Sequence, residues 1–281
     1  MSKEKFYSIY KKISESLSEY ETIEYPVYVP SKDRPKSKTV NNLVESKIPH
    51  YLVIEPQDIE KYEITSEYTT LLVMPENDRG IAYVRNFCKE HSILNSHRYH
   101  WQLDDNILNF RVRQNNKNIK HDCRNLLSAS EYIMNLFDNV GALGLCHTCF
   151  AFSKKVDVAF NKQTYSCVLV NNELDIKWRD NVAEDTDYSL QVLSEGYCTI
   201  VLNRILINKQ VSSANSGGHK NTDDCRMNRA LGLQKYWPGA FVVTREYNRV
   251  KIKPSRIWKT FTQMPKGPEL DLNESSIEKF L

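Results

Sequence analysis

Two adjacent acids, Asp104 and Asp105, are the first residues of this sequence whose type and spacing suggest chemistry. They follow the apolar segment "RYHWQL" and precede Asn106. Two like charges repel, and burying them is costly unless a cation or good hydrogen-bond donors compensate. Mg²⁺ and Mn²⁺ prefer such oxygen ligands, and Mg²⁺ is typically held by one or two carboxylates plus substrate phosphates. The pair therefore fits a metal–phosphate site or a solvated Asp-Asn turn.

A second acidic group stands in "EDTDYSLQ", which contains Glu184, Asp185 and Asp187. Acids at the start of a helix are stabilised by the free N–H groups there, so capping is the simpler interpretation. Three acids within four positions exceed what capping needs. One of these carboxylates could act as a general base that takes the proton of an acceptor hydroxyl.

Histidine occurs in two further motifs. The polar loop "SANSGGHK" combines a flexible Gly-Gly step with His219, which suits phosphate or metal contact as well as an ordinary surface loop. "CHTC" (Cys146, His147, Cys149) lacks a second cysteine or histidine pair, so zinc binding is not expected and buried strand cysteines are favoured.

Two basic stretches could hold a nucleic-acid backbone, although solvated strands can have the same composition. The first follows the acid pair in a polar, Asn-rich segment that we expect to be a loop. The second, residues 245–259, interleaves basic side chains with aromatic ones. The expected phosphate-contacting residues are Arg111, Arg113, Lys117, Lys120 and Arg124 in the first stretch and Arg249, Lys251 and Trp258 in the second.

The elements that must position these residues alternate between strand and helix, which favours βαβ units and a mainly parallel sheet. The expected strands are 25–30, 50–56, 69–78, 98–103, 142–153, 165–171 and 198–209, and the expected helices are 3–19, 39–47, 81–92, 125–141, 184–197 and 225–237. Residues 241–253 are expected to form a β-hairpin. The acid pair thus follows the carboxyl end of a strand, which is where open α/β sheets bind ligands.

The totals are those of an ordinary globular protein: 281 residues, 41% hydrophobic, 26% charged, and a net charge of +3. We expect an N-terminal helix over 1–20, one domain over 21–262 and a tail over 263–281. The chain contains no apolar stretch typical of a signal peptide or membrane span, and seven scattered cysteines favour reduced thiols. A cytoplasmic location is expected.

The ordered set "YVPSKDRP", "VIEP", "GIAYVRN", "LDDN", "EDTDYSLQ" and "SGGH" resembles GT-A fold nucleotide-sugar glycosyltransferases, and more narrowly the TET-associated glycosyltransferase family, over roughly residues 25–225. Phage members of that family modify hydroxymethylated bases in DNA. The resemblance implies an α/β fold in a single domain, with a GT-A-like, Rossmann-type mixed sheet flanked by helices.

The resemblance also implies roles for individual residues. Those expected to bind the nucleotide sugar are Pro30, Ser31, Arg34, Glu55, Arg85, Asn86 and Asp104. Asp104, Asp105 and His219 would hold Mn²⁺ or Mg²⁺, although Asn106 stands where the family usually has an acid. Asp185 is the expected base, beside Glu184. Trp178, Tyr188 and Trp258 are candidates to hold a flipped base.

The implied activity is transfer of a sugar, such as glucose or arabinose, from a UDP-sugar to 5-hydroxymethylcytosine in double-stranded DNA. Inversion at the anomeric carbon and metal dependence are expected. A saccharide, lipid or protein acceptor is an alternative. A nucleotidyltransferase would be expected to have a Gly-rich loop, which "PSKDRPKSK" lacks. The intact acids argue against a DNA-binding module without catalysis.

Overall fold

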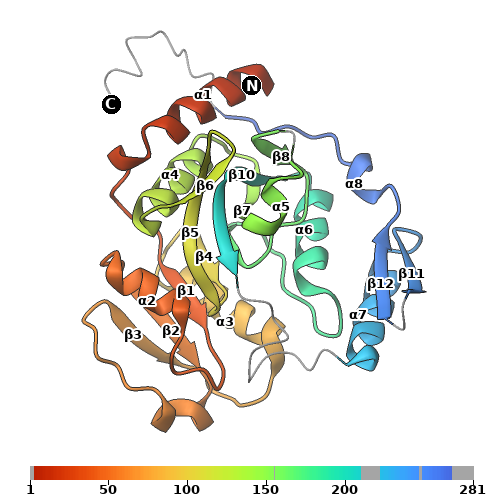
Figure 1. Ribbon diagram of the computed structural model, residues 1–281. Helices are drawn as coiled ribbons and strands as arrows, with labels where there is room; N and C mark the ends of the chain where they lie inside the picture. The colour runs from red at the N-terminus through yellow and green to blue at the C-terminus, as the bar shows by residue number, and fades with distance from the viewer. Residues whose placement is uncertain (1–2, 155, 210–221, 247–248, 268–281) are drawn as a thin grey trace.

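A mixed β-sheet forms the centre of the molecule, with helices packed on both faces (Figure 1). The computed structural model describes residues 3–154, 156–209, 222–246 and 249–267. Its strands are β1 (Val27–Pro30), β2 (His50–Ile54), β3 (Thr69–Val73), β4 (Tyr99–Leu103), β5 (Ile107–Gln114), β6 (Lys117–Lys120), β7 (Val140–His147), β8 (Val158–Phe160), β9 (Cys167–Asn171), β10 (Cys198–Lys209), β11 (Phe241–Glu246) and β12 (Arg249–Pro254).

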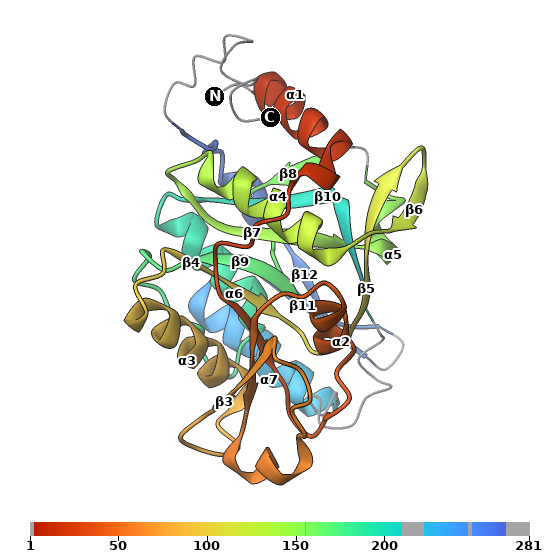
Figure 2. The same ribbon diagram turned by 90° about the vertical axis from the view of Figure 1, so that its left-hand side faces the viewer.

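The helices cover the sheet in two layers. They are α1 (Lys3–Glu15), α2 (Lys38–Glu45), α3 (Gly80–Leu94), α4 (Cys123–Asn135), α5 (Thr148–Ala151), α6 (Glu184–Ser194), α7 (Asp223–Tyr236) and α8 (Ile257–Thr260), with 3₁₀ turns η1 (Leu17–Glu19) and η2 (Pro56–Lys61). Figure 2 shows α4 on one side of the sheet and α3 on the other. The larger core joins α1, α2 and α4 to one face, and two smaller clusters join α3 and α6 to the other.

The central strands are buried on both faces. Every residue of β4 and β9 is buried, which is expected for strands covered by helices on either side. The strand order is β3-β2-β1-β4-β9-β7-β10-β5-β6, with β8 paired to β10. The expected fold class, a mixed sheet flanked by helices in one α/β domain, is therefore confirmed.

The expectation of a mainly parallel sheet is wrong. Among the described strands of this sheet, four pairings are parallel and five are antiparallel. Only Asp104, Asp105 and Asn106 separate β4 from β5, and a connection that short cannot contain a crossover helix. The chain therefore turns back at the acid pair, and β5 pairs antiparallel with β10.

The first basic stretch is a hairpin, not the expected loop. Strands β5 and β6 pair from Arg111–Lys120 to Gln114–Lys117. The two turn residues, Asn115 and Asn116, both have positive φ values, 48° and 60°. Asparagine tolerates this left-handed conformation, and two such residues in sequence form the tight turn that matches the twist of a hairpin. The Asn-rich composition thus marked a turn between two strands.

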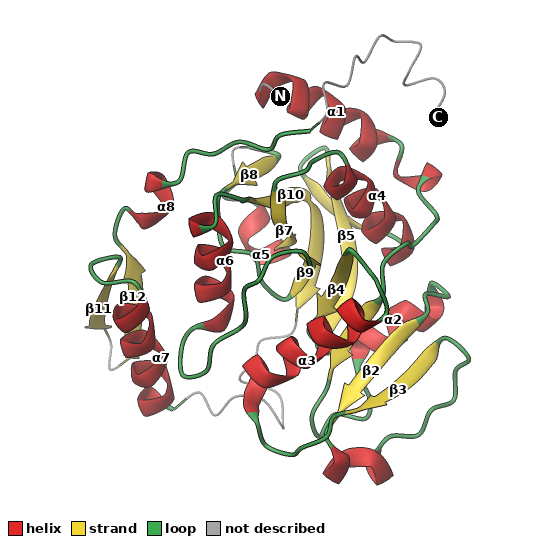
Figure 3. Ribbon diagram, turned by 180° about the vertical axis from the view of Figure 1, so that it is seen from behind, coloured by secondary structure: helices red, strands yellow, loops and turns green. Residues whose placement is uncertain are grey.

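The other boundaries differ from expectation by a few residues, with one change of type. The strand expected over 142–153 ends at His147, and Thr148–Ala151 form a helical turn. Consequently Cys146 is buried while Cys149 is exposed. The expected hairpin over 241–253 is present as β11 and β12, packed beside α7 (Figure 3).

The N-terminal helix is part of the domain's core. Helix α1 packs on α4 through Phe6, Tyr10 and Ile13, which are all buried in the large core. The expected tail is described only as far as residue 267. Within the described ranges, none of the helices combines the length and apolarity needed to cross a bilayer.

Candidate functional site

Several of the candidate residues lie along one edge of the sheet. Strands β1, β2, β4, β7 and β10 run in the same direction, because β4 and β7 are each antiparallel to β9 between them. Their carboxyl ends therefore meet at one edge, together with the amino end of β9. This edge carries Ser31, the acid pair, His147, Ser166 and Lys209. Ligands of α/β sheets bind at such edges.

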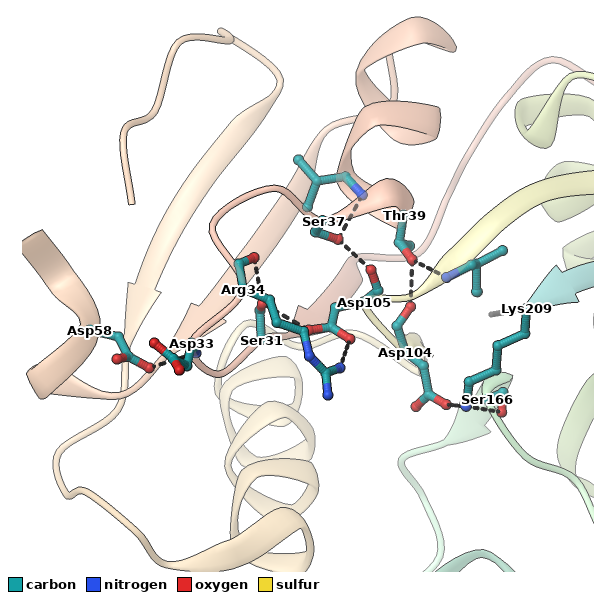
Figure 4. Close-up of polar contacts among 12 residues, drawn as sticks. Ser31, Asp33, Arg34, Ser37, Thr39, Asp58, Asp104, Asp105, Ser166 and Lys209 are labelled. Atoms are coloured by element: carbon teal, nitrogen blue, oxygen red, sulfur yellow. Dashed lines mark hydrogen bonds and ion pairs between the residues drawn. The ribbon is translucent and has the colours of Figure 1, made fainter. Parts of the chain in front are cut away.

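The two adjacent aspartates point in different directions, as Figure 4 shows. Their backbone turn is held from α2 and the residue before it. Ser37 Oγ donates to the carbonyl of Asp105 at 2.7 Å, and Thr39 Oγ1 donates to the carbonyl of Asp104 at 2.5 Å. Thr39 Oγ1 also accepts from the amide of Ile107 at 2.9 Å. With the backbone fixed in this way, each carboxylate contacts a different group of side chains.

Asp105 faces the 30–37 loop, the segment that follows β1. Its Oδ1 accepts from Arg34 Nη1 at 2.6 Å and its Oδ2 from Ser31 Oγ at 3.0 Å. The side chain is only 6% exposed. Burial raises the pKa of Asp105 above its usual value, although Arg34 and Ser31 act in the opposite direction. Both carboxylate oxygens thus have protein partners in the loop.

The 30–37 loop is itself anchored from η2. Tyr62 Oη lies 2.8 Å from Ser31 Oγ and accepts from the amide of Arg34 at 3.0 Å. The buried Asp58 accepts from the amide of Asp33 at 3.0 Å, and Asp33 has a positive φ of 53°. These contacts fix the loop where the resemblance places the nucleotide pocket.

Asp104 instead faces the middle of the edge. One carboxylate oxygen is paired with Lys209 Nζ, which also donates to Ser166 Oγ at 3.1 Å (Figure 4). The other lies 3.5 Å from Arg85 Nη2. Burial opposes ionisation of Asp104, but Lys209 and Arg85 outweigh it and hold its pKa below the usual value. Its side chain remains 26% exposed.

Arg85 connects Asp104 to Asp185. Its Nη2 lies 3.1 Å from Asp185 Oδ1, and its side chain is 6% exposed. Gln102 holds it from β4, accepting from Nη1 at 3.4 Å and donating to the Arg85 carbonyl at 2.9 Å. We call Asp104, Arg85, Asp185 and Lys209 the central charge cluster.

Asp185 stands in the first turn of α6, where backbone N–H groups favour negative charge. Burial nevertheless raises its pKa to about 7, and Glu184 and Asp104 add to the rise while Arg85 opposes it. Asp185 is 23% exposed, so it can reach a bound molecule. A carboxylate that titrates near neutral pH suits a general base.

The other two acids of α6 have structural partners. Glu184 pairs with Arg229 of α7 at 2.7 Å. Asp187 is fully buried and accepts from Arg179, Gln191 and the Trp237 indole. These contacts attach α7 to α6, which leaves Asp185 as the one acid of this turn in the central charge cluster.

A divalent ion would find a limited set of ligands here. Among the described residues, His, Cys, Asp and Glu form no group of three that could hold a metal. Asp105 is paired with Arg34 and Ser31, and Asp104 is paired with Lys209 and Arg85, but Asp104 is the more exposed of the two. Mg²⁺ can be held by one carboxylate plus substrate phosphates and waters, so Asp104 would fit that role if the ion replaced Lys209 at the carboxylate. His219 lies outside the described residues.

Two of the residues expected to bind the donor have side chains that are paired with other groups of the protein. Asn86 donates to the carbonyl of Trp178 at 2.9 Å and accepts from its amide at 2.9 Å, which fixes the segment before α6. Glu55 pairs with Lys32 at 2.8 Å and accepts from Gln57. Pro30 ends β1 and leads into the 30–37 loop. Donor binding by Asn86 stays a prediction, with its side-chain amide already paired to the Trp178 backbone.

The candidates for holding a flipped base are also placed differently. Trp178 and Tyr188 stack on each other at 3.9 Å with an interplanar angle of 7°, and both are buried. That expectation is wrong for these two residues, because their faces are covered by the core beside α6. Trp258 is partly buried against the cluster that joins α6, α7 and β11.

The two basic stretches lie in separate places. Figure 1 shows the β5–β6 hairpin apart from the β11–β12 hairpin, which carries Arg249 and Lys251. In the first stretch, Arg124 donates to the carbonyls of Ser46, Lys47 and Glu21, so it closes the end of α2 and is not a free phosphate contact.

The remaining basic residues of the first stretch lie on the β5–β6 hairpin. Arg111 braces it through Asn109 and the Asn118 carbonyl. Arg113 lies over the ring of Phe152 at 5.1 Å, and Lys117 and Lys120 are exposed. Contact of these side chains with phosphates stays a prediction.

Sequence reasoning missed Lys209, Thr39 and Tyr62. Lys209 was recognised only as the last residue of a strand, 105 positions after Asp104. A lysine at the carboxyl end of a buried strand is a signal in itself, since lysine is almost never buried without a partner. For Thr39 and Tyr62 no pattern in the sequence indicates the contact.

Three comparisons with known proteins place the chain. The model of the family described as TET-Associated Glycosyltransferase matches residues 25–218. None of the curated proteins matches. Among solved structures, "Crystal Structure of a Mycobacterial Protein" aligns at TM-score 0.50 with 9% identity, covering 93% of this chain and 92% of that one. "Crystal Structure of A197 from STIV" aligns at TM-score 0.41 with 10% identity, covering 67% and 86%.

Proposed function

The chain belongs to the TET-associated glycosyltransferase family, and from that premise we propose that it transfers a sugar from a UDP-sugar to the hydroxymethyl group of 5-hydroxymethylcytosine in DNA. The observation that carries the proposal is the central charge cluster, in which Arg85 joins Asp104 to Asp185 at the ligand-binding edge of the sheet.

The donor nucleotide binds at the 30–37 loop in this proposal. The loop is held rigid by Asp105, Asp58 and Tyr62, so a nucleotide meets a site that needs little rearrangement. The diphosphate then extends toward the cations of the central charge cluster.

Arg85 and Lys209 supply positive charge where the leaving diphosphate becomes more negative. Donors that are already oriented stabilise such charge without reorganisation during the reaction. Arg85 is oriented by Gln102, and Lys209 by Ser166. When Mn²⁺ or Mg²⁺ is bound, with Asp104 as its protein carboxylate, the ion adds Lewis-acid stabilisation of the same charge.

Asp185 acts as the general base. It takes the proton of the acceptor hydroxyl as that oxygen bonds to the anomeric carbon and the bond to the diphosphate breaks. Attack from the side opposite the diphosphate inverts the anomeric centre. A pKa near 7 leaves a useful fraction of Asp185 ionised at neutral pH while keeping it basic enough to accept a proton.

Nucleoside mass measurement tests the proposal directly. The full chain is incubated with UDP-glucose or UDP-arabinose, Mn²⁺ or Mg²⁺, and duplex DNA containing either hydroxymethylated or unmodified cytosine. The DNA is then digested to nucleosides, and the nucleoside masses are measured by mass spectrometry. We expect a gain of one sugar on hydroxymethylcytosine alone. Unchanged masses with every hexose and pentose donor tried would reject the DNA acceptor.

A further inference from the structure

His147 is a histidine at the ligand-binding edge that none of the roles above uses. It is the last residue of β7, and its backbone pairs with Ile207 near the end of β10. The residues that follow β4 and end β10, Asp104 and Lys209, therefore share its edge of the sheet. His147 also begins the short α5, which places the helical turn beside the site.

The imidazole of His147 has an unused polar atom. Its Nε2 is buried and has no hydrogen-bond partner among the described residues. A buried polar atom without a partner costs free energy, so such atoms in native proteins commonly mark a place where a ligand or water binds. Burial and the charge of Lys209 lower the pKa of His147 to about 4, against the effect of Asp104. The neutral ring can donate or accept a hydrogen bond.

Aromatic rings connect His147 to the surface. Its ring meets Tyr165 edge-on at a centroid distance of 4.6 Å and lies nearly parallel to Phe150 at 6.0 Å. Phe150 is 46% exposed and Phe152 is 66% exposed. Large apolar side chains exposed together on a short turn indicate a binding surface more than a packing requirement.

Positive charge accompanies these rings. The Arg113 guanidinium lies over Phe152, and Lys117 and Lys120 follow on the same β5–β6 hairpin. Exposed aromatic rings next to cations match the two parts of a nucleotide, since bases stack on rings and phosphates pair with cations.

Tyr165, the ring of this group that lies farthest from Phe150 in the sequence, is close to the central charge cluster. Tyr165 directly precedes Ser166, whose Oγ accepts from Lys209 Nζ at 3.1 Å and whose carbonyl accepts from the amide of Asp104 at 2.8 Å. Tyr165 is therefore next in the chain to a residue that contacts the central charge cluster, and the charge of Asp185 adds to the burial that raises the pKa of its phenol. The rings thus extend from exposed Phe150 to the neighbourhood of the proposed base.

We propose that His147, Tyr165 and Phe150 form the acceptor wall, the side of the site that receives the target base. The base turned out of the duplex stacks along Phe150, and His147 Nε2 hydrogen-bonds its polar edge, which brings the hydroxymethyl group to Asp185. Arg113 and the β5–β6 hairpin hold the flanking phosphates. This inference rests on the proposed function, because it requires a DNA acceptor.

The test separates acceptor binding from donor binding. Phe150→Ala and His147→Ala are compared with Phe150→Trp and with Tyr132→Ala, a control that removes a surface aromatic of 38% exposure on α4. Each protein is assayed for the KM of hydroxymethylated duplex DNA, for turnover, and for UDP affinity by calorimetry with Mn²⁺. A 2-aminopurine placed next to the target base in the duplex becomes more fluorescent when the target base turns out and no longer stacks on it.

We expect Phe150→Ala to raise the KM for DNA by about tenfold, the size typical of one lost stacking contact. His147→Ala should raise it by about tenfold as well, through the lost hydrogen bond to the base, and UDP affinity should be unchanged in both variants. The 2-aminopurine signal should weaken in Phe150→Ala and return in Phe150→Trp, while Tyr132→Ala behaves as wild type. Wild-type KM and fluorescence in both variants would overturn the acceptor wall. So would weaker UDP binding in His147→Ala, which would assign His147 to the donor. If the wild-type protein transfers no sugar to DNA, the proposed function fails and the acceptor wall fails with it.

Discussion

Asp104 and Asp105 are neighbours in the chain, yet they belong to two regions of different character. Asp105 lies in the 30–37 loop region, where both of its oxygens are taken by Arg34 and Ser31 and its side chain is 6% exposed. Asp104 lies in the central charge cluster, where it shares Arg85 with Asp185 and is 26% exposed. The first region is internally paired and suits binding. The second has shared, partly exposed charges and suits a reaction in which charge moves.

A second comparison shows why location matters as much as pKa. Burial raises the pKa of both Asp185 and Glu131 to about 7. Glu131 accepts from the Trp101 indole and from the amides of Glu24 and Tyr25, deep between α4 and the sheet. Asp185 stands at the carboxyl edge of the strands beside Arg85. Shifted pKa values occur in structural carboxylates as well as functional ones, so the edge position is what supports the proposed catalytic role of Asp185.

The largest effect is expected for Asp185→Asn. The amide cannot take the acceptor proton, so turnover should fall by roughly 10³-fold, within the range general bases contribute. Donor affinity should change little, because the 30–37 loop is untouched. Measuring kcat together with UDP affinity checks this. Asp180→Asn, a nearby acid outside the cluster, is the control, and turnover within a few-fold of wild type in Asp185→Asn would contradict the assignment.

The pair Asp104→Asn and Asp105→Asn tests the division between the two regions. Asp104→Asn should lower kcat by on the order of 100-fold, as expected when one oriented charge is lost near the reacting groups. Asp105→Asn should mainly raise the KM for the donor and reduce the free energy of unfolding by about 2 kcal/mol, since it loses a charge-assisted hydrogen bond to Arg34. Equal effects of the two variants on kcat and stability would remove the distinction.

The pH dependence of turnover should follow Asp185. Its raised pKa means that the base is protonated below pH 7, so kcat should rise with pH and level off above about 7. Arg85 lowers this pKa, and therefore Arg85→Gln should move the acidic limb of the profile to higher pH as well as lowering kcat. A profile that stays in place in Arg85→Gln would show that the limb belongs to another group.

The smallest effect is expected for Glu131→Gln, and it concerns stability. A folded pKa of about 7 lies above the usual value near 4.3, so the folded state binds more protons between these limits and stability is lost as pH rises through 7. The wild-type advantage over Glu131→Gln in unfolding free energy should therefore fall by about 2 kcal/mol from pH 5 to pH 8. Urea unfolding measures this, and the pH profile of turnover should stay unchanged.

Much of the fold could be predicted from local pattern. The helices over 184–194 and 223–236, and the strands over 50–54 and 198–209, follow from apolar periodicity and from glycine or acid signals at their ends. The turn at Asn115–Asn116 was misinterpreted because two asparagines suggest a loop as readily as a hairpin turn, and only pairing with β10 distinguishes them.

The family, the fold class and the positions of the acids follow from the sequence, because motif order and strand ends can be read directly along the chain. The sequence could not determine which acid does what. The carboxylates of Asp104 and Asp105 point to different sides of the same turn. Their directions depend on contacts with Thr39, Ser37 and Lys209, which are distant in the chain. Partners far apart in sequence meet only when the sheet forms, so tertiary structure alone separated the carboxylate paired with Arg34 from the one that shares Arg85 with Asp185.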